Sequence, residues 1–421
     1  MLKFVLKGLI RDRSRSFFPV LIVTAGVLVT VFLTAFMSGY MESMVRQNAR
    51  FDTGHVKIVT NAYADKISQK PYDLGFIDSE SDFEQWKRDF PSIRWTPRIY
   101  FGALMDVPDE EGNTLEQGDV FGMAIDLWDP GAVQDIHLQE ALVQGRIPQA
   151  PSEILISQEL FSKLRLQLDS TVTLLGSTLH GAMSFQNYII SGTVSFGVHA
   201  LDRGGIVTDI EDARLFLDME GGASEYFGFL PDGIYDDGEA TKIKREFNAR
   251  YNSEDEFAPQ MLALTDQNDL GFMLSYAGLA LGLINVVFIL IIAIVLWNAG
   301  LLNSIRRYGE FGLRLAMGER KGRLYKWLLV EALAVGVVGS LIGAALGIGL
   351  IQYFHVHGID FGAFTQDTSM MVENVVYLSA DTKNLILGII PGPVATVLGA
   401  MLAGIGIFRR NTAKLFKELE T

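Results

Sequence analysis

Residues 17–40 read FFPVLIVTAGVLVTVFLTAFMSGY, an apolar run long enough to cross a membrane as one helix. A span needs about 20 mainly apolar residues to cross hydrocarbon about 30 Å thick. Three similar runs follow, and none has a charge in its middle third. The four predicted transmembrane helices are 17–40, 270–299, 327–354 and 385–408. The alternative for the first run is a cleaved signal peptide, but the run exceeds the apolar core of such peptides and no clear cleavage site follows.

The positions of lysine and arginine predict the orientation of these helices. Five such residues lie in 1–16, seven in 300–326 and four in 409–421, whereas 355–384 has only Lys383. Because cytoplasmic loops are enriched in lysine and arginine, we expect the N-terminal segment, the 300–326 loop and the C-terminal tail in the cytoplasm. The chain is then a multi-pass protein of the inner (cytoplasmic) membrane, with 41–269 and the 355–384 loop on the periplasmic, extracytoplasmic side.

The large segment between the first two spans has the composition of an acidic, water-soluble domain. Residues 40–270 contain 39 Asp and Glu against 18 Lys and Arg, while the whole chain has a net charge of -14. An acidic surface repels phosphate backbones, so we expect no nucleic-acid partner. The chain has no cysteine, which excludes disulfides and cysteine nucleophiles.

Strand and helix patterns alternate within 41–269, which predicts an α+β domain, with a second lobe inserted at about 120–222. The strand patterns are 55–60, 99–107, 172–176, 187–196 and 204–210, and the helix patterns are 82–89, 157–164, 210–217 and 239–250. Ser81 is the predicted N-cap of the first helix, and Asp209 with Asp212 resembles a capping box for the third.

Catalytic, metal and nucleotide motifs are not evident in the sequence. His355 and His357 could ligate a metal, but no further histidine or acidic cluster accompanies them, so a polar membrane exit is favoured. The sequence has no G-x-x-x-x-G-K-[ST] phosphate-binding loop. We therefore expect no enzyme activity and no bound metal or cofactor in this chain.

The predicted cytoplasmic loop 300–326 reads GLLNSIRRYGEFGLRLAMGERKGRLYK, with aromatic residues among closely spaced glycines. Apolar residues at helical spacing give one face, and charged residues run along another. Such a helix can lie on lipid or dock into a groove on a partner protein. The alternative is a basic loop that only enforces topology. The candidate docking residues are Ile305, Arg306, Arg307, Glu310, Arg314 and Gly318.

Glycines recur every fourth residue in two of the predicted spans, and such stripes allow another helix to approach closely. The predicted helix-packing residues are Gly278, Gly282, Gly339, Gly343 and Gly347. Pro19, Pro391 and Pro393 are expected to kink their helices.

The same segments carry a family resemblance that covers nearly the whole chain. IRRYGEFGLRLAMG (305–318), followed by Glu331 and the glycine-rich run 327–354, resembles the signature region of FtsX-like ABC transporter permeases. The order of QGRIP (144–148), EILISQELFSKLRL (153–166) and IISGTVSFGVHALDRGGIVTDIEDARLFL (189–217) is similar to the outer domain of macrolide-efflux-type members. This last stretch and GHVKIVTNAYADK (54–66) resemble the lipoprotein-releasing permeases most.

The resemblance implies a permease dimer, made with a second copy or a paralogue, that works with separate cytoplasmic ABC ATPase subunits, which bind the ATP. The 305–318 segment would be the helix that couples to the ATPase, and closure of the ATPase would move the outer domain. Two departures stand out. The tail RRNTAKLFKELET (409–421) lacks the proline that the family usually has there. The stretch GSTLHGAMSFQNY (176–188) is short and lacks the proline of the hook found in lipoprotein-releasing permeases that hand cargo to a periplasmic carrier. The second departure puts delivery of cargo to a periplasmic carrier in doubt.

The expected substrate is amphiphilic, such as a lipoprotein taken from the outer leaflet, because the spans offer almost no charged lining to a hydrophilic solute. The alternatives are a hydrophobic-drug or macrolide-type efflux permease, and a mechanotransmission permease that regulates a cell-envelope enzyme. A membrane-anchored enzyme or adhesion receptor would need one anchor or a catalytic cluster, and the sequence indicates neither.

Overall fold

The computed structural model describes residues 13–109, 111–306, 313–360, 375–379 and 382–409. The chain divides into two compact units. The helical unit comprises Met1–Glu42, Ser275–Ile359 and Val376–Thr421, and the sheet unit comprises Ser43–Leu274 and Asp360–Val375. Its larger part, Ser43–Leu274, overlaps the predicted outer segment, 41–269, and the position of that segment outside the membrane stays a prediction.

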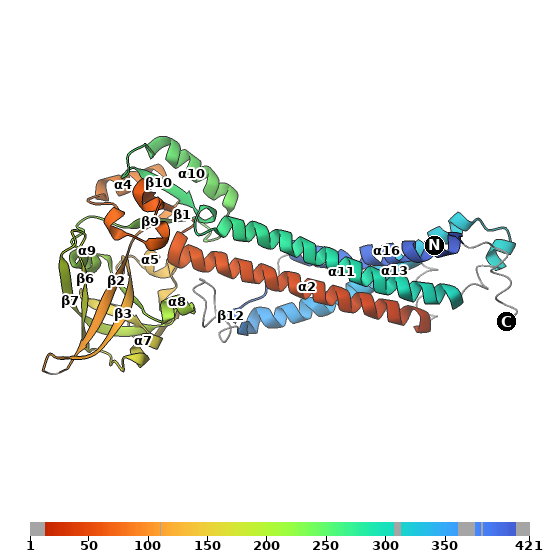
Figure 1. Ribbon diagram of the computed structural model, residues 1–421, viewed down its shortest axis with the longest axis horizontal. Coiled ribbons are helices and arrows are strands. Elements are labelled where there is room, and N and C mark those ends of the chain that lie inside the picture. The colour runs from red at the N-terminus through yellow and green to blue at the C-terminus, as the bar shows by residue number, and fades with distance from the viewer. Residues whose placement is uncertain (1–12, 110, 307–312, 361–374, 380–381, 410–421) are drawn as a thin grey trace. The chain divides into compact units, whose positions relative to one another are not determined.

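Three long helices dominate the helical unit (Figure 1). They are α2 (Arg13–Asn48), α11 (Leu270–Arg306) and α13 (Lys321–His357). Each is long and apolar enough to cross a membrane, over Phe17–Thr53, Leu270–Leu301 and Lys321–His357 respectively. These helices contain the first three predicted spans, whose placement in a membrane stays a prediction. Pro19 lies inside α2, which continues through it.

The fourth predicted span is divided into two helices, α15 (Thr382–Ile389) and α16 (Pro391–Arg409). The break falls at Ile390, directly before Pro391, whose ring nitrogen cannot donate a helical hydrogen bond. The continuous apolar helix in this predicted span, Pro391–Gly404, is shorter than the three long apolar helices. The count of four spans therefore stays a prediction. The short strands β11 (Ile359–Asp360) and β12 (Val375–Val376) pair between α13 and α15.

The core of the helical unit forms along one face of α2. Val23, Val27, Val31 and Ala35 recur every fourth residue, which places them on a single face, and all are buried. Their neighbours in this cluster come from α11, α13, α16 and the segment after β12, and they are Ile292, Ala293, Leu296, Ile351, Leu378 and Ala395. Residues far apart in sequence thus form one hydrophobic core.

The sheet unit contains one mixed sheet of ten strands, in the order β10-β1-β9-β2-β3-β8-β5-β7-β4, with β6 paired to β2 and β7. The strands are β1 (Val56–Thr60), β2 (Arg94–Pro108), β3 (Thr114–Ile125), β4 (Leu142–Gly145), β5 (Glu153–Ser157), β6 (Thr171–Ser177), β7 (Met183–Val194), β8 (Gly205–Asp209), β9 (Glu225–Phe229) and β10 (Pro259–Ala263). Strands β3 and β8 run parallel, as do β5 and β7, and the other pairs are antiparallel. The predicted α+β class is confirmed. Strands from the predicted lobe, 120–222, belong to the same sheet as the flanking strands, and the lobe itself stays a prediction.

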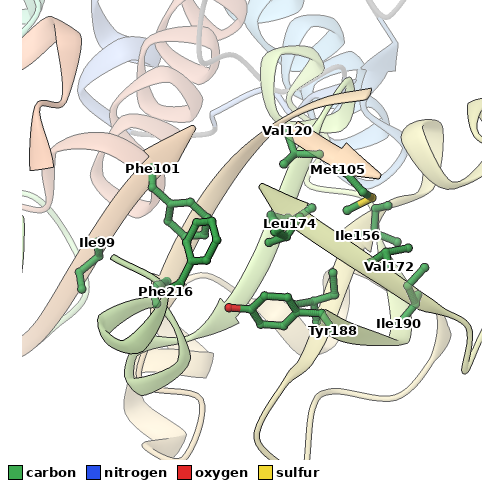
Figure 2. Packing of buried hydrophobic residues seen from close by; sticks show 14 of the residues in the cluster. Ile99, Phe101, Met105, Val120, Ile156, Val172, Leu174, Tyr188, Ile190 and Phe216 are labelled. Carbon is green, nitrogen blue, oxygen red and sulfur yellow. The ribbon is translucent and has the colours of Figure 1, made fainter. Parts of the chain in front are cut away.

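Short helices cover the sheet and close its cores. They are α3 (Asn61–Ala64), α4 (Glu80–Asp89), α5 (Pro130–Asp135), α6 (Leu138–Ala141), α7 (Gln158–Lys163), α8 (His199–Asp202), α9 (Ile210–Leu217) and α10 (Asp237–Tyr251). Figure 2 shows one core, in which Phe216 of α9 faces Phe101 of β2, with ring centroids 5.5 Å apart. Alternate residues of β6 and β7, such as Val172 and Tyr188, are buried in the same cluster.

Two predicted caps are wrong in detail. Helix α4 begins after Ser79, not Ser81, and the Ser79 hydroxyl hydrogen-bonds the Tyr226 hydroxyl instead of capping the helix. Asp209 does cap α9, where its carboxylate accepts from the Glu211 N–H. The Asp212 carboxylate, however, accepts from the N–H of Ser152, so there is no reciprocal capping box.

Candidate functional site

The predicted docking segment is described only in part. Ile305 and Arg306 end helix α11, while Arg307 and Glu310 lie outside the described residues. Residues 313–316 form a helical turn, on which Arg314 is exposed. A cationic side chain is therefore presented to solvent between α11 and α13.

Gly318 ends this helical turn with a backbone conformation that favours glycine. Its φ is +88°. The Gly318 N–H donates to the Leu315 carbonyl at 3.1 Å, and the Glu319 N–H donates to the Arg314 carbonyl at 3.1 Å. This pair of bonds is the Schellman arrangement, which closes a helix with a left-handed residue. An added Cβ at Gly318 would meet nothing within 4 Å of the described chain, so conformation, not crowding, selects glycine here.

The two glycine stripes differ in their surroundings. A Cβ at Gly339, Gly343 or Gly347 would lie 2.6–2.9 Å from atoms of α2, so this stripe of α13 lies directly against α2. The Thr24 hydroxyl donates to the Gly339 carbonyl across this seam at 3.2 Å. A Cβ at Gly278 or Gly282 would meet nothing within 4 Å in the part of the chain that is described.

Three histidines contact backbone or aromatic groups. The Nδ1 of His355 lies 2.8 Å from the Leu378 carbonyl oxygen, and the ring of His357 stacks on Tyr353. Among the described residues, no group of three or more His, Asp or Glu is placed to hold a metal ion. His55 is buried, and its Nδ1 accepts from the Leu230 N–H at 3.0 Å. Burial, followed by the nearby Arg94 charge, lowers the pKa of His55 to about 4.

A buried network of charges lies where α2 ends within the sheet unit, and the sequence patterns did not indicate it. Lys57 pairs with Glu225 at 3.0 Å, and Lys70 lies 2.6 Å from Asp52 and 3.8 Å from Glu225. The Tyr63 hydroxyl donates to Glu225 at 2.6 Å. Lys57 and Glu225 are almost completely buried.

The energetics of this network depend on its pairing. Burial lowers the pKa of Lys57, and the charge of Glu225 opposes that effect. Burial also acts to lower the pKa of Lys70, but the carboxylates of Glu225 and Asp52 outweigh it and raise the pKa. Buried charges are tolerated only when they are paired and hydrogen-bonded, so the loss of one member leaves its partner uncompensated. The network therefore fixes the segments that carry it relative to one another within the sheet unit.

The C-terminal part of the chain is similar to a known family. Residues 282–412 match the family model described as FtsX-like permease C-terminal. The chain is 34% identical over 122 residues to the macrolide export ATP-binding/permease protein MacB 1/2 of Paracoccus denitrificans, a match that covers 27% of this chain and 18% of that protein. It is 25% identical over 158 residues to MacB of Hyphomonas neptunium, covering 37% of this chain and 23% of that protein.

A solved structure also matches. It is the periplasmic region of MacB from Actinobacillus actinomycetemcomitans, with a TM-score of 0.35 and 10% identity, covering 52% of this chain and 93% of that one. The two sequence matches with MacB proteins span less than a quarter of those relatives' length. The resemblance to FtsX-like, macrolide-efflux-type permeases is confirmed by the family match and these relatives. A closer likeness to the lipoprotein-releasing permeases is not shown.

Proposed function

We propose that this chain is an ABC transporter permease of the FtsX-like and macrolide-efflux type. In this proposal, it uses a partner ATPase to move its sheet unit and to extract or export an amphiphilic substrate across the inner membrane. The observation that carries this proposal is the FtsX-like match over 282–412, which contains the turn between α11 and α13. The proposed orientation puts that turn in the cytoplasm and the sheet unit outside.

The ATPase is proposed to be a partner subunit. The relatives are named ATP-binding/permease proteins, whereas these 421 residues contain no phosphate-binding loop. ATP binding must therefore come from another polypeptide or segment. We place its contact at the turn that carries Arg314 and Gly318, and we propose that two permease chains work together on a pair of ATPases.

An amphiphilic substrate fits the apolar character of the long helices. Helix α11 exposes Leu279, Leu283 and Leu290 in the described chain, and such a surface suits lipid or an acyl chain. A lipidated protein is the first candidate. A hydrophobic small molecule is the second, and it is favoured by the macrolide-export names of the relatives.

The test is the ATPase activity of the complex in lipid nanodiscs. Wild-type chain, co-expressed with candidate ABC ATPases, should retain one of them through purification. A lipidated protein or a macrolide should then stimulate hydrolysis. Arg314→Glu should reduce that stimulation by about fivefold or more, the scale expected when one coupling contact is lost.

The matched control is Arg245→Glu, the same substitution at an exposed arginine of α10 in the sheet unit. It should leave the stimulation unchanged. If no ATPase co-purifies, or if neither class of amphiphile changes hydrolysis while a soluble cell-wall enzyme binds in an ATP-dependent way, the regulatory alternative replaces this proposal.

A further inference from the structure

Helix α2 ends inside the sheet unit in a π-helical turn, η1 (Ala49–Thr53), which is followed by Gly54 at φ +62°. The last carbonyls of a helix have no intrahelical N–H partner and need other donors. Every carbonyl of this turn has one. The donors are the Gly54 N–H to Ala49 at 3.0 Å, Arg98 Nη1 to Arg50 at 2.6 Å, the Tyr100 hydroxyl to Phe51 at 2.6 Å, Lys57 Nζ to Asp52, and Gln267 Nε2 to Thr53 at 3.3 Å.

Four of these donors are side chains from elsewhere in the sheet unit. Lys57 belongs to β1, Arg98 and Tyr100 belong to β2, and Gln267 lies just before α11. All four are at most 2% exposed. We call Lys57, Arg98, Tyr100 and Gln267 the carbonyl socket.

The charge of the socket suits a helix C-terminus, where the backbone dipole presents partial negative charge. Lys57 and Arg98 are cationic, and the guanidinium of Arg98 also lies 4.3 Å from the ring centroid of Phe227. Glu225 compensates Lys57, as described above. Since charged donors make the stronger hydrogen bonds, Lys57 and Arg98 hold the turn at defined points on β1 and β2, two strands that β9 separates in the sheet.

The same turn also contacts the segment that leads into α11. The side-chain amide of Asn268 donates to the Asp52 carboxylate. Asn268 and Asp269 have φ of 51° and 57°, and α11 begins directly after them. The end of α2 and the approach to α11 are therefore attached to one five-residue turn.

We infer that the carbonyl socket is the joint through which displacement of α2 reaches the sheet, with Tyr100 and Arg98 as its positioning residues. This inference rests on the proposed function, because that function supplies the displacement. A helix end with unfilled carbonyls could slip or fray when its far end is moved. Here slippage would break several buried hydrogen bonds at once, so β1, β2 and the start of α11 must follow the turn.

The decisive variant is Tyr100→Phe, which removes one hydroxyl from the socket and leaves the ring in place. The matched control is Tyr226→Phe in β9, which removes an equally buried hydroxyl that bonds Ser79 at 2.6 Å, away from the turn. Both variants lose one buried hydrogen bond, so both should lower the unfolding temperature of the protein by a similar amount. A purely structural role therefore predicts the same behaviour for the two.

The readout is the distance between spin labels at Val29→Cys on α2 and Ser253→Cys in the sheet unit, a pair that is unique because the chain has no other cysteine. It is measured in the full permease–ATPase complex in nanodiscs, with and without ATP. In the wild type and in Tyr226→Phe, we expect a narrow distribution that shifts with ATP. In Tyr100→Phe, the nucleotide-free distribution should broaden and the shift should be largely lost, while basal ATP hydrolysis continues.

Two outcomes separate this inference from the proposed function. If the wild type shows no ATP-dependent shift, the proposed function fails. The widths of the nucleotide-free distributions in Tyr100→Phe and Tyr226→Phe then still show whether the socket fixes the turn to the sheet. If Tyr100→Phe and Tyr226→Phe give equal widths and equal shifts, the socket is only a helix cap. Arg98→Met should also broaden the nucleotide-free distribution and remove most of the ATP-dependent shift. Arg98→Lys, which keeps a cationic donor, should retain most of the wild-type width and shift.

Discussion

Substituting valine for Gly343 should weaken the packing of α13 on α2. The new Cβ would lie 2.6 Å from the carbonyl oxygen of Thr24 and 3.0 Å from the Cβ of Val27. Real Cβ contacts below 3.0 Å essentially do not occur, so the helices would have to separate by at least 0.4 Å at this point. Such separation would also lengthen the hydrogen bond from Thr24 to Gly339.

The expected free-energy loss follows from two opposing terms. Overpacking of a filled interface costs about 1–3 kcal/mol. Valine regains about 0.4 kcal/mol relative to glycine through its better helix propensity. We therefore expect Gly343→Val to destabilise the helical unit by about 1–2 kcal/mol. The measurement is the shift in the denaturation midpoint of the purified protein in detergent, followed by tryptophan fluorescence.

Gly349→Val is the matched control, because Gly349 lies in the same helix and an added Cβ there would meet nothing within 4 Å of the described chain. It should be neutral or slightly stabilising. An equal response of the two variants would refute the conclusion that the Gly339–Gly343–Gly347 stripe is selected by close contact with α2.

Three further predictions concern acid stability, the turn before α13, and topology. Because burial holds the folded-state pKa of His55 at about 4, against 6.5 for an ordinary histidine, its contribution to stability is complete above pH 6.5 and is lost as the pH falls towards 4. The unfolding free energy should fall by about 3 kcal/mol over that range. His55→Asn, which keeps an acceptor but does not titrate, should remove the part of the slope that lies above the titration range of Asp and Glu, and an unchanged slope there in a urea titration would contradict this. Gly318→Ala should cost about 1–2 kcal/mol at φ +88° and reduce the stimulated ATPase activity, with Gly318→Asn milder, and full activity of the alanine variant would show that the turn tolerates another conformation. A single cysteine at Ser253 should react with a membrane-impermeant thiol reagent in cells with a permeabilised outer membrane, one at Ser304 should not, and the reverse pattern would overturn the orientation.

The sequence predicted best those features that depend on neighbouring residues. The three helices that are long and apolar enough to cross a membrane follow from hydropathy alone, because crossing hydrocarbon requires a continuous apolar run of defined length. The bounds of α9, Ile210–Leu217, agree with the predicted 210–217, since helix periodicity and the Asp209 cap are both local signals. The break before Pro391 agrees with a predicted kink, because proline removes a backbone donor wherever it stands.

Several strands were not predicted because their patterns depend on distant partners. The first half of β3 is polar and exposed, since it pairs with β2 in solvent and does not alternate against a core. In β9, the buried residue Glu225 interrupts the apolar pattern, although all five residues of that strand are buried. Hydropathy places such a carboxylate on the surface unless its partner is known.

The sequence alone predicted the membrane class, and it determined the acidic composition and α+β pattern between the first two predicted spans and the resemblance to ABC permeases. Only the tertiary structure decided the role of Lys57, Arg98 and Tyr100: in the sequence, Lys57 and Tyr100 are ordinary residues of two predicted strands, and Arg98 lies just before the second of these strands. They gather at the end of α2 because helix carbonyls need donors that the helix itself cannot supply. The partners of such a carbonyl lie far away in sequence and leave no periodic signal, so hydrogen-bond geometry, not hydropathy, identified this joint.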